Sequence, residues 1–435
     1  MTNYTHGDAI RAHYQEAVQW RRELHRLPQP AWLEFFATGL IATKLSEWGY
    51  ELKLGQDIID PEKQLLPPSA EKMLAEYNRA IDAGINEEFI APAKGGFTGV
   101  VGTIKGDLPG PTVAFRFDID SNEARESQEA SHRPAREGFA SSIPGYAHMC
   151  GHDSHVAIGL LLAVYFSENR DKLKGTVKLI FQPNEENLSG AAAMIEKGIL
   201  ADVDYLLGGH VGVALKETGK VAIDVHSSLA VTRSEITFKG KPSHSGIRPD
   251  LGKNALLGAC AAITNLYAIA RHGLGPSRIN VGVIEGGSTW NVIPERTYFR
   301  METRAVDNEI NEYMQTKAKE VLAGAAIMYD LDWEVKPAAS APSGRNSEEL
   351  VKIGLTVGKK LSWVTELVPE LAWFGSEDYM VMAELVQKQG GKAIFVLHGT
   401  PIGGGHHSAT FDVDEEVIFN GADFYAAMYE EIINQ

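Results

Sequence analysis

A ten-residue segment, Tyr146–His155, concentrates the side chains of this sequence that are best suited to binding a metal ion. The chain has only two cysteines and fourteen histidines, yet the segment holds one cysteine and three histidines. Thiolate and imidazole are good ligands for borderline-soft divalent metals, and a neighbouring aspartate can fix the tautomer of a ligating histidine. The residues are His148, Cys150, His152, Asp153 and His155. The pattern predicts a metal site, and a buried free cysteine near surface histidines is the alternative.

Other side chains of the same kinds stand at or after the ends of predicted strands. The strands are expected at 176–181, 205–210 and 393–397, and the side chains are Glu185, Glu186, His210, His406 and His407. An α/β sheet binds its ligands in the crevice at the carboxyl ends of its strands. A dinuclear hydrolase site needs about five or six ligands. The predicted ligands are Cys150, His152, Glu186, His210 and one of His406 or His407.

The adjacent glutamates suggest two roles. Neighbouring side chains on an extended backbone point to opposite sides. Glu186 is therefore expected to bind metal, while Glu185 faces the substrate as the general base that takes a proton from water. A solvated acidic pair at the end of a strand is the alternative for both.

A cysteine hydrolase that uses Cys150 as its nucleophile is a competing interpretation. It predicts inactivation by alkylation and indifference to chelators. Such an enzyme has no need of His210, Glu186 and a late histidine, so the metal site is the favoured hypothesis.

The fold that must position these residues is predicted as α/β. Residues 1–225 should form the first segment of a catalytic domain, a mixed sheet flanked by helices, and 338–435 its second segment. Helices are expected at 8–26, 35–48 and 156–166, and strands at 99–104 and 112–117 in addition to those above. Residues 56–95 are interpreted as an insertion that carries its own helix.

A smaller α+β domain is predicted over 226–337, inserted into the catalytic domain. It should contain a four-stranded sheet and two helices. The pattern predicts strands at 231–239, 279–284 and 296–304 and helices at 253–271 and 307–327. Residues 337–345 are expected to be the linker back to the catalytic domain.

Length and composition limit the number of domains, the kinds of partner and the cellular compartment that can be expected. A length of 435 residues favours two or more domains. The net charge of −16 argues against a nucleic-acid or anionic-membrane partner. Two cysteines, no apolar N-terminal core of a signal peptide and no run of 18 apolar residues predict a cytoplasmic protein.

The order of several motifs resembles a known family. The motifs include His-x-Cys-Gly-His-Asp-x-His, Gln-Pro-x-Glu-Glu, Ser-His-Ser-Gly, Gly-Gly-x-x-x-Asn-Val-Ile-Pro, Gly-Ser-Glu-Asp and a late His-His. Together they resemble the amidohydrolase branch of the dinuclear metallopeptidases, which includes aminoacylases, glutamate carboxypeptidase and plant auxin-conjugate hydrolases. Within it, the insertion and the Ser131-His-Arg-Pro segment are most similar to p-aminobenzoyl-glutamate hydrolases, and bacterial indole-3-acetyl-aspartate hydrolases look similar too.

The resemblance implies a role for each matching residue. Cys150 would bridge two divalent ions, Mn or Zn, with His152, Glu186, His210 and His407 as the other ligands; His407 is preferred because His-Ser-Ala-Thr-Phe matches the family pattern. Glu185 falls on the catalytic base. His244 falls on a histidine that reaches the neighbouring protomer's site and polarises the scissile carbonyl. Asn291 and Arg304 fall on positions that hold the substrate's carboxylate, and Asp153 and Asp120 are expected to support the ligands from behind.

The implied activity is hydrolysis of the amide bond of N-acyl amino acids. The substrate implied first is p-aminobenzoyl-glutamate, and indole-3-acetyl-aspartate or general N-acyl amino acids are the alternatives. The small domain would be a lid and dimerisation domain, so a homodimer is expected, and the other arrangement is a hetero-oligomer with a related second chain. A non-catalytic metal-binding partner protein is the alternative of another class. Tyr146, Phe139 or the insertion could line an apolar pocket for an aromatic acyl group.

Two departures from the family pattern affect the site. Asp118-Ile-Asp120-Ser-Asn-Glu replaces the usual Asp-x-Asp-Ala-Leu-Pro, which leaves the roles of both aspartates open. Asn184 replaces the usual alanine before the glutamates, and its side chain could contact a substrate.

Overall fold

The computed structural model describes residues 4 and 6–434, which form two compact units. The first unit comprises the described residues up to His226, then Arg345–Trp373, then those from Glu377 onward. The second comprises Ser227–Gly344 and Phe374–Ser376.

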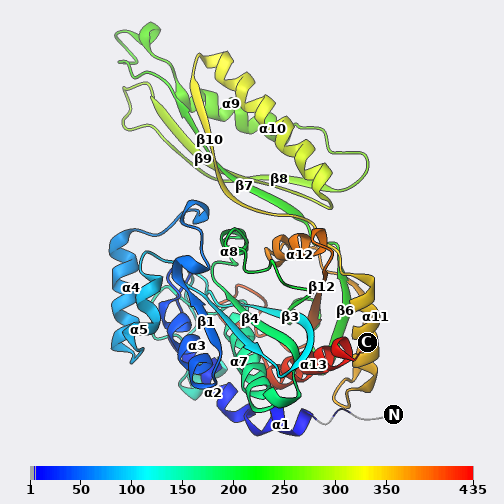
Figure 1. Ribbon diagram of the computed structural model, residues 1–435. Coiled ribbons are helices and arrows are strands. Elements are labelled where there is room, and N and C mark those ends of the chain that lie inside the picture. Colours follow the sequence, from blue (N-terminus) through cyan, green and yellow to red (C-terminus); the bar gives the residue numbers. More distant parts are fainter. Residues whose placement is uncertain (1–3, 5, 435) are drawn as a thin grey trace. The chain divides into compact units, whose positions relative to one another are not determined.

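The first unit is built on an eight-stranded mixed sheet with the order β1-β2-β4-β3-β5-β12-β6-β11 (Figure 1). The strands are β1 (Glu51–Leu54), β2 (Val100–Lys105), β3 (Leu108–Asp118), β4 (Lys174–Gln182), β5 (Tyr205–Val211), β6 (Lys220–His226), β11 (Glu366–Ala372) and β12 (Lys392–His398). β4, β3, β5 and β12 pair in parallel. Their carboxyl ends therefore meet at one edge, as the predicted crevice requires.

Helices cover both faces of this sheet (Figure 1). Those of the first unit are α1 (His6–Ala12), α2 (Tyr14–Arg26), α3 (Phe35–Glu47), α4 (Ala70–Asp82), α5 (Glu87–Ile90), α6 (Arg133–Glu137), α7 (His152–Glu168), α8 (Gly190–Ile195), α11 (Glu348–Lys360), α12 (Tyr379–Lys388) and α13 (Glu416–Ile433). One face packs against α2, α3, α7 and α13, and the other against α8 and α12. α7 is apolar on nearly all sides, because it lies between the sheet and other helices.

The second unit is an antiparallel four-stranded sheet with two helices on one face (Figure 1). Its elements are β7 (Ala230–Lys239), α9 (Ala255–Tyr267), β8 (Ser277–Gly286), β9 (Arg296–Ala305), α10 (Asn308–Tyr329) and β10 (Asp332–Ala341), and the strand order is β10-β7-β9-β8. The predicted fold class, a mixed α/β sheet with a separate four-stranded α+β unit, is confirmed.

Some predicted elements differ from the observed ones. The expected helix over 8–26 is two helices that break at His13. The predicted linker 337–345 is wrong in its first half, because β10 continues to Ala341 by pairing with β7. β6 and β11 were not predicted. Within the insertion, the predicted helix is α4, capped by the Ser69 side chain, which accepts a hydrogen bond from the Lys72 N–H.

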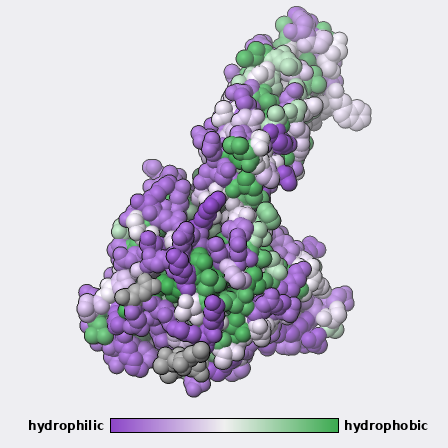
Figure 2. Space-filling view, turned by 90° about the vertical axis from the view of Figure 1, so that its right-hand side faces the viewer, coloured by the Kyte–Doolittle hydropathy of each residue, from purple (hydrophilic) through white to green (hydrophobic). Residues whose placement is uncertain are grey.

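Hydrophobic side chains are distributed unequally over the surfaces of the two units. Fourteen large hydrophobic residues are exposed among the described residues, and only Leu66, Leu74 and Leu108 belong to the first unit. In Figure 2, hydrophobic side chains interrupt the hydrophilic surface of the second unit. Among the described helices, none has the combined length and apolar character that crossing a bilayer requires.

Candidate active site

A tight turn at Gly151 brings Cys150 and His152 to the sheet edge. Gly151 has φ +94° and precedes the first residue of α7. A Cβ at this position would lie 2.6 Å from Cγ2 of Val211, so both the conformation and the close approach require glycine. The turn sets a thiol and an imidazole beside the end of β5, which carries His210.

The five predicted ligands come together from four separate segments. Cys150 Sγ lies 3.4 Å from Nε2 of His210, and His407 Nε2 lies 3.3 Å from Oε2 of Glu186. His152 Nε2 is 4.0 Å from Oε1 of Glu186. Ligand atoms of two overlapping trios, Cys150–His152–His210 and Cys150–Glu186–His407, each lie within 4.8 Å of one another. Cys150 belongs to both trios, the position that a bridging ligand would take.

The orientations of two buried imidazoles suit a cation. His152 directs Nδ1 at Asp120, 3.0 Å from its carbonyl oxygen and 3.2 Å from Oδ1, while its buried Nε2 has no hydrogen-bond partner among the described residues. His210 donates from Nδ1 to the Val211 carbonyl at 2.8 Å. Each ring can therefore keep a proton on Nδ1 while its Nε2 faces the cluster, where the lone pair would be available to a cation, as in metal-binding histidines.

His406 and His407 differ in what their rings contact. His406 Nε2 accepts a hydrogen bond from the Val213 N–H at 3.0 Å, which leaves its Nδ1–H facing Cys150 Sγ at 3.5 Å. His407 adopts φ +59°, uncommon for a residue with a side chain, and meets Glu186. His406 is therefore arranged as a donor to the sulfur, and His407 as a ligand.

Charge couples Glu186, His407 and Cys150. Burial opposes ionisation of Glu186, but the hydrogen bond to His407 and the charge of His152 lower its pKa to about 2. Hydrogen bonds to Cys150 and Glu186 raise the pKa of His407 to about 10. Burial, followed by the charge of Glu186, raises the pKa of the Cys150 thiol. Binding of a cation would reverse that direction, because a coordinating thiol is deprotonated.

Glu185 is buried beside the ligand cluster. It is 7% exposed, and its Oε2 is 3.9 Å from His152 Nε2. Burial and the nearby carboxylates of Glu377, Asp378 and Glu186 raise its pKa well above the ordinary value. This environment strengthens Glu185 as a proton acceptor.

A buried ion network lies next to Glu185 and includes Glu377 and Asp378 of the Gly-Ser-Glu-Asp motif, which were expected to be supporting or structural. Arg116 on β3 contacts Asp118 at 2.7 Å and both Glu377 and Asp378 at 2.9 Å. Arg116 and all three carboxylates are almost fully buried. The sequence signals were this motif and an arginine at an otherwise apolar position of a central strand; the ion pairs between them were not predicted.

The aspartates near the ligands have distinct partners. Besides contacting His152, Asp120 accepts the Glu186 backbone N–H on Oδ2 at 3.0 Å, so it supports two ligand positions. Asp153, expected beside His152, instead contacts Arg21 at 2.7 Å and His25 at 2.8 Å. The helix start turns this carboxylate away from the cluster.

His155 is excluded as a ligand by its hydrogen bonds. Its Nδ1 contacts Oδ1 of Asp118, and its Nε2 accepts the Val211 N–H at 3.0 Å. Both ring nitrogens are therefore occupied. The ring anchors β5 to β3 beside the ligands.

The loop that carries the glutamates is fixed by a residue from the N-terminal segment. Glu34 accepts the Asn184 N–H at 2.9 Å and the Thr98 hydroxyl at 2.6 Å. Asn184 has φ +54° and donates from Nδ2 to the Ser189 hydroxyl at 2.6 Å. The suggestion that the Asn184 side chain contacts substrate is therefore not supported, since its amide serves the turn.

The three remaining predicted site residues belong to the second unit. His244 accepts the N–H groups of Gly246 and Ile247 on Nδ1, each at 3.2 Å. Its other ring nitrogen, Nε2, lies 3.4 Å from the amide nitrogen Nδ2 of Asn291. Arg304 donates to Glu302 from Nε at 2.8 Å and from Nη2 at 3.2 Å.

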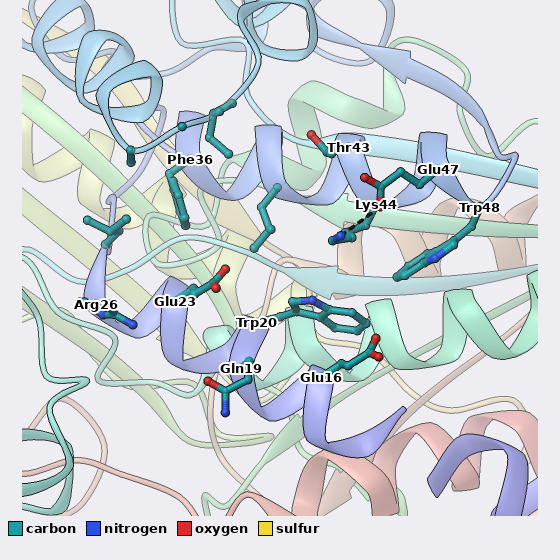
Figure 3. Close-up of a pocket in the computed structure, with 15 residues that line it drawn as sticks. Glu16, Gln19, Trp20, Glu23, Arg26, Phe36, Thr43, Lys44, Glu47 and Trp48 are labelled. Atoms are coloured by element: carbon teal, nitrogen blue, oxygen red, sulfur yellow. Dashed lines mark hydrogen bonds and ion pairs between the residues drawn. The ribbon is translucent and has the colours of Figure 1, made fainter. Parts of the chain in front are cut away.

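The described residues of the first unit line several hollows. A hollow of about 860 Å³ between α2 and α3 is lined by residues that include Trp20, Trp48 and Glu23, and none of the predicted ligands lines it (Figure 3). A hollow of about 390 Å³ is lined by Tyr146, close in sequence to Cys150. Phe139, in contrast, is 2% exposed and packs against Arg22, which excludes it as a wall of an open pocket.

Comparison with known proteins identifies the family. A profile of Peptidase family M20/M25/M40 matches residues 114–431, well over half of the chain. The chain belongs to this family. The predicted relationship is thereby confirmed, and so is the enzyme class, a metal-dependent amidohydrolase.

Individual members of the family are similar over nearly the full length. The chain is 38% identical to a Haemophilus influenzae homolog of one subunit of p-aminobenzoyl-glutamate hydrolase, over 96% of this chain and 99% of that protein. It is 39% identical to the indole-3-acetyl-aspartic acid hydrolase of Enterobacter agglomerans, over 95% and 94%.

Solved structures of members have the same fold. A crystal structure of an aminobenzoyl-glutamate utilization protein from Klebsiella pneumoniae has a TM-score of 0.84 at 32% identity and covers 98% of both chains. A dinuclear metal binding peptidase of Bacillus subtilis has a TM-score of 0.69 at 25% identity, covering 98% and 99%. Divalent metal ions are thus implied for the family, and the cluster around Cys150 offers a suitable donor set.

Proposed function

We propose that the protein hydrolyses the amide bond between an aromatic acid and an acidic amino acid, with p-aminobenzoyl-glutamate as the substrate. The single observation that carries the proposal is the convergence of Cys150, His152, Glu186, His210 and His407 beside the buried Glu185. Aminobenzoyl-glutamate is proposed as the substrate because two relatives, at 38% and 32% identity, are named for it. Indole-3-acetyl-aspartate is the second candidate, because a relative at 39% identity acts on it.

Cys150, His152, Glu186, His210 and His407 would hold two divalent ions, and Cys150, which belongs to both trios of ligand atoms, would be shared. The mixed thiolate, imidazole and carboxylate set is compatible with zinc and with manganese. The fit rests on His152 and His210, whose Nε2 lone pairs are turned toward the cluster. When bound, the ions supply Lewis acidity toward the carbonyl and lower the pKa of a water toward about 7.

Glu185 would move the proton. Its carboxylate accepts a proton from the attacking water and passes it to the nitrogen of the leaving amino acid, so that one residue serves as base and then as acid. The raised pKa, caused by burial and by Glu377, matches this requirement. Asp120 holds both the His152 ring and the Glu186 backbone in place meanwhile.

His244 would stabilise the oxyanion. Two backbone N–H groups occupy its Nδ1, so Nε2–H is available to donate to the carbonyl oxygen as charge develops there. Asn291, at 3.4 Å, would orient the ring or contact the substrate. Arg304 would bind a carboxylate of the substrate with its planar fork.

The second unit would act as a lid and as the dimerisation surface, with His244 serving the site of the neighbouring protomer. Its edge strand β8 and eleven exposed large hydrophobic residues support a homodimer. The Haemophilus influenzae relative is named after one subunit of a hydrolase, so a hetero-oligomer with a related second chain is the other arrangement. The cytoplasm is the proposed compartment, since both cysteines are free.

The decisive experiment supplies purified, metal-loaded protein with p-aminobenzoyl-glutamate and indole-3-acetyl-aspartate in parallel reactions. Release of p-aminobenzoate with the higher kcat/KM is the expected result. Hydrolysis of N-acetyl amino acids alone would refute the aromatic substrate, and hydrolysis of nothing would favour the non-catalytic partner protein. Loss of activity on alkylation with no effect of chelators would favour the cysteine nucleophile.

A further inference from the structure

The face of the four-stranded sheet opposite α9 and α10 carries a cluster of arginines. Along β9 the side chains alternate, and Phe299 and Met301 join the core beneath the helices. Arg304 and Glu302 therefore lie on the other face, which is only partly covered. Arg233 on β7 and Arg278 on β8 are paired with β9 on this same face.

Arg278 and Arg304 are directly opposite each other in the antiparallel register of β8 and β9. Cross-strand partners hold their Cβ atoms about 5 Å apart, and like charges in this position destabilise a sheet. On the same face, two residues before Arg304 on β9, Glu302 is opposite Arg233 of β7. The register thus places a second arginine, Arg278, opposite the arginine that Glu302 already pairs.

The local carboxylate does not balance the cluster. Glu302 already binds Arg304 through both oxygens and also lies 3.4 Å from Arg233 Nε. Arg278 donates from Nη1 to the carbonyl of the neighbouring Ser277, and no carboxylate among the described residues lies within ion-pair distance of its guanidinium. In a chain of net charge −16, an unbalanced cationic cluster is a local exception.

The cluster is anchored where the chain enters and leaves the unit. Arg304 Nη1 donates to the Ser376 hydroxyl at 3.3 Å, and that hydroxyl donates to the Leu229 carbonyl at 2.9 Å. Leu229 follows the last residue of β6 by three positions, and Ser376 directly precedes Glu377 of the buried network.

We infer that Arg278 and Arg304 together bind the two carboxylates of the acidic amino acid in the substrate, and that Arg278 selects an acidic over a neutral side chain. The inference rests on the proposed function. Guanidinium forks bind carboxylates through two parallel hydrogen bonds, and a dicarboxylate would remove the repulsion between the paired arginines. Arg304 already has Glu302 as a partner, so a substrate with one carboxylate would leave Arg278 without one.

The test compares p-aminobenzoyl-glutamate with p-aminobenzoyl-glutamine on the metal-loaded wild type and on Arg278→Gln. Wild type should prefer the glutamate conjugate in kcat/KM. In Arg278→Gln that preference should fall by about tenfold or more, because a hydrogen bond to a charged group is lost. Activity on the glutamine conjugate should stay within about twofold, and Arg278→Lys should restore part of the preference.

The control is Arg296→Gln, which removes an exposed arginine from the same strand face, next to Tyr298. This substitution should leave the preference for the glutamate conjugate over the glutamine conjugate intact. As a second measurement, free L-glutamate should raise the Tm of wild type more than that of Arg278→Gln, and L-glutamine should raise neither.

Three outcomes would overturn the inference. An unchanged preference in Arg278→Gln would remove Arg278 from substrate selection, and equal losses on both conjugates would assign it a purely structural role. If wild type hydrolyses neither conjugate, the proposed function fails and the inference fails with it. If wild type is active and Arg278→Gln keeps the same preference for the glutamate conjugate, the inference is refuted and the proposed function stands.

Discussion

The two units of the molecule use charge and hydrophobic surface in opposite ways. In the first unit, ionic side chains such as Arg116, Asp118 and Asp153 are completely buried, and few large hydrophobic residues reach solvent. In the second unit, the arginines lie on an open sheet face and large hydrophobic residues are exposed.

This difference reflects two physical requirements. Buried ions need fixed partners, so they hold a site rigidly but cannot adapt to another molecule. Exposed arginines and hydrophobic residues are stabilised only when something covers them. The first unit therefore has the properties of a preorganised reaction centre, and the second has the exposed charge and hydrophobic surface that the proposed substrate and dimer contacts would need.

Removal of divalent metal should produce the largest effect and should confine it to the first unit. Exhaustive chelation is expected to reduce turnover to background, with recovery on adding manganese or zinc. Calorimetry should show a lower melting temperature for the first unit only, because the cluster at Cys150 lies there. A uniform shift of both transitions would contradict this assignment.

Glu185→Gln should reduce kcat by about 10³ or more while the bound metal content is unchanged, since the variant keeps the shape of the residue and loses the proton acceptor. Elemental analysis and steady-state kinetics measure the two quantities. As a control, Glu384→Gln on the exposed side of α12 should leave kcat unchanged. Full turnover in Glu185→Gln would remove this residue from catalysis.

Ile284→Lys should convert the protein to a monomer and lower kcat by about 10², the typical effect of losing an oxyanion donor. Ile284 is 46% exposed on the edge strand β8, so a charge there opposes strand pairing. Sedimentation velocity gives the oligomeric state. The matched control is Leu74→Lys, because Leu74 is 59% exposed on α4 of the first unit. This variant should keep the wild-type oligomeric state and kcat.

Arg116→Met should lower the free energy of unfolding of the first unit by about 3–5 kcal/mol, because three buried carboxylates lose their counter-ion. Urea unfolding measures the change. The equivalent substitution of Arg248, whose pair with Asp250 is exposed in the second unit, should leave the free energy of unfolding nearly unchanged. Similar losses in the two variants would contradict the comparison between the units.

The stability of the first unit should fall as pH rises through 8. Burial opposes the charge of His25, but hydrogen bonds to Asp153 and Glu126 outweigh it and raise its pKa from 6.5 to about 8. The raised pKa contributes its stability fully below pH 6.5 and loses it above 8, a change of about 2 kcal/mol. Urea unfolding at pH 6 and pH 9 should show that change in wild type and not in His25→Gln. His272→Gln in the second unit is the control and should behave as wild type.

Part of the site was predictable because its signals are local. Cys150-Gly-His152 and Glu185-Glu186 are short motifs whose residue types limit the chemistry, and their positions at strand ends predicted that they would meet. The choice between His406 and His407 could not be made from residue type. It depends on a backbone conformation, φ +59° at His407, and on the Val213 N–H that occupies His406.

The sequence by itself determined the residue types that could bind metal, the α/β class and the presence of a separate four-stranded α+β unit, because periodicity and composition are local properties. Only the tertiary structure decided which carboxylate supports which group. Asp120 rather than Asp153 contacts His152, and Arg116 meets Asp378 across 262 positions. The cross-strand pairing of Arg278 with Arg304 likewise appears only in the sheet register. Contacts of this kind depend on how distant segments pack, and no periodicity in the chain encodes them.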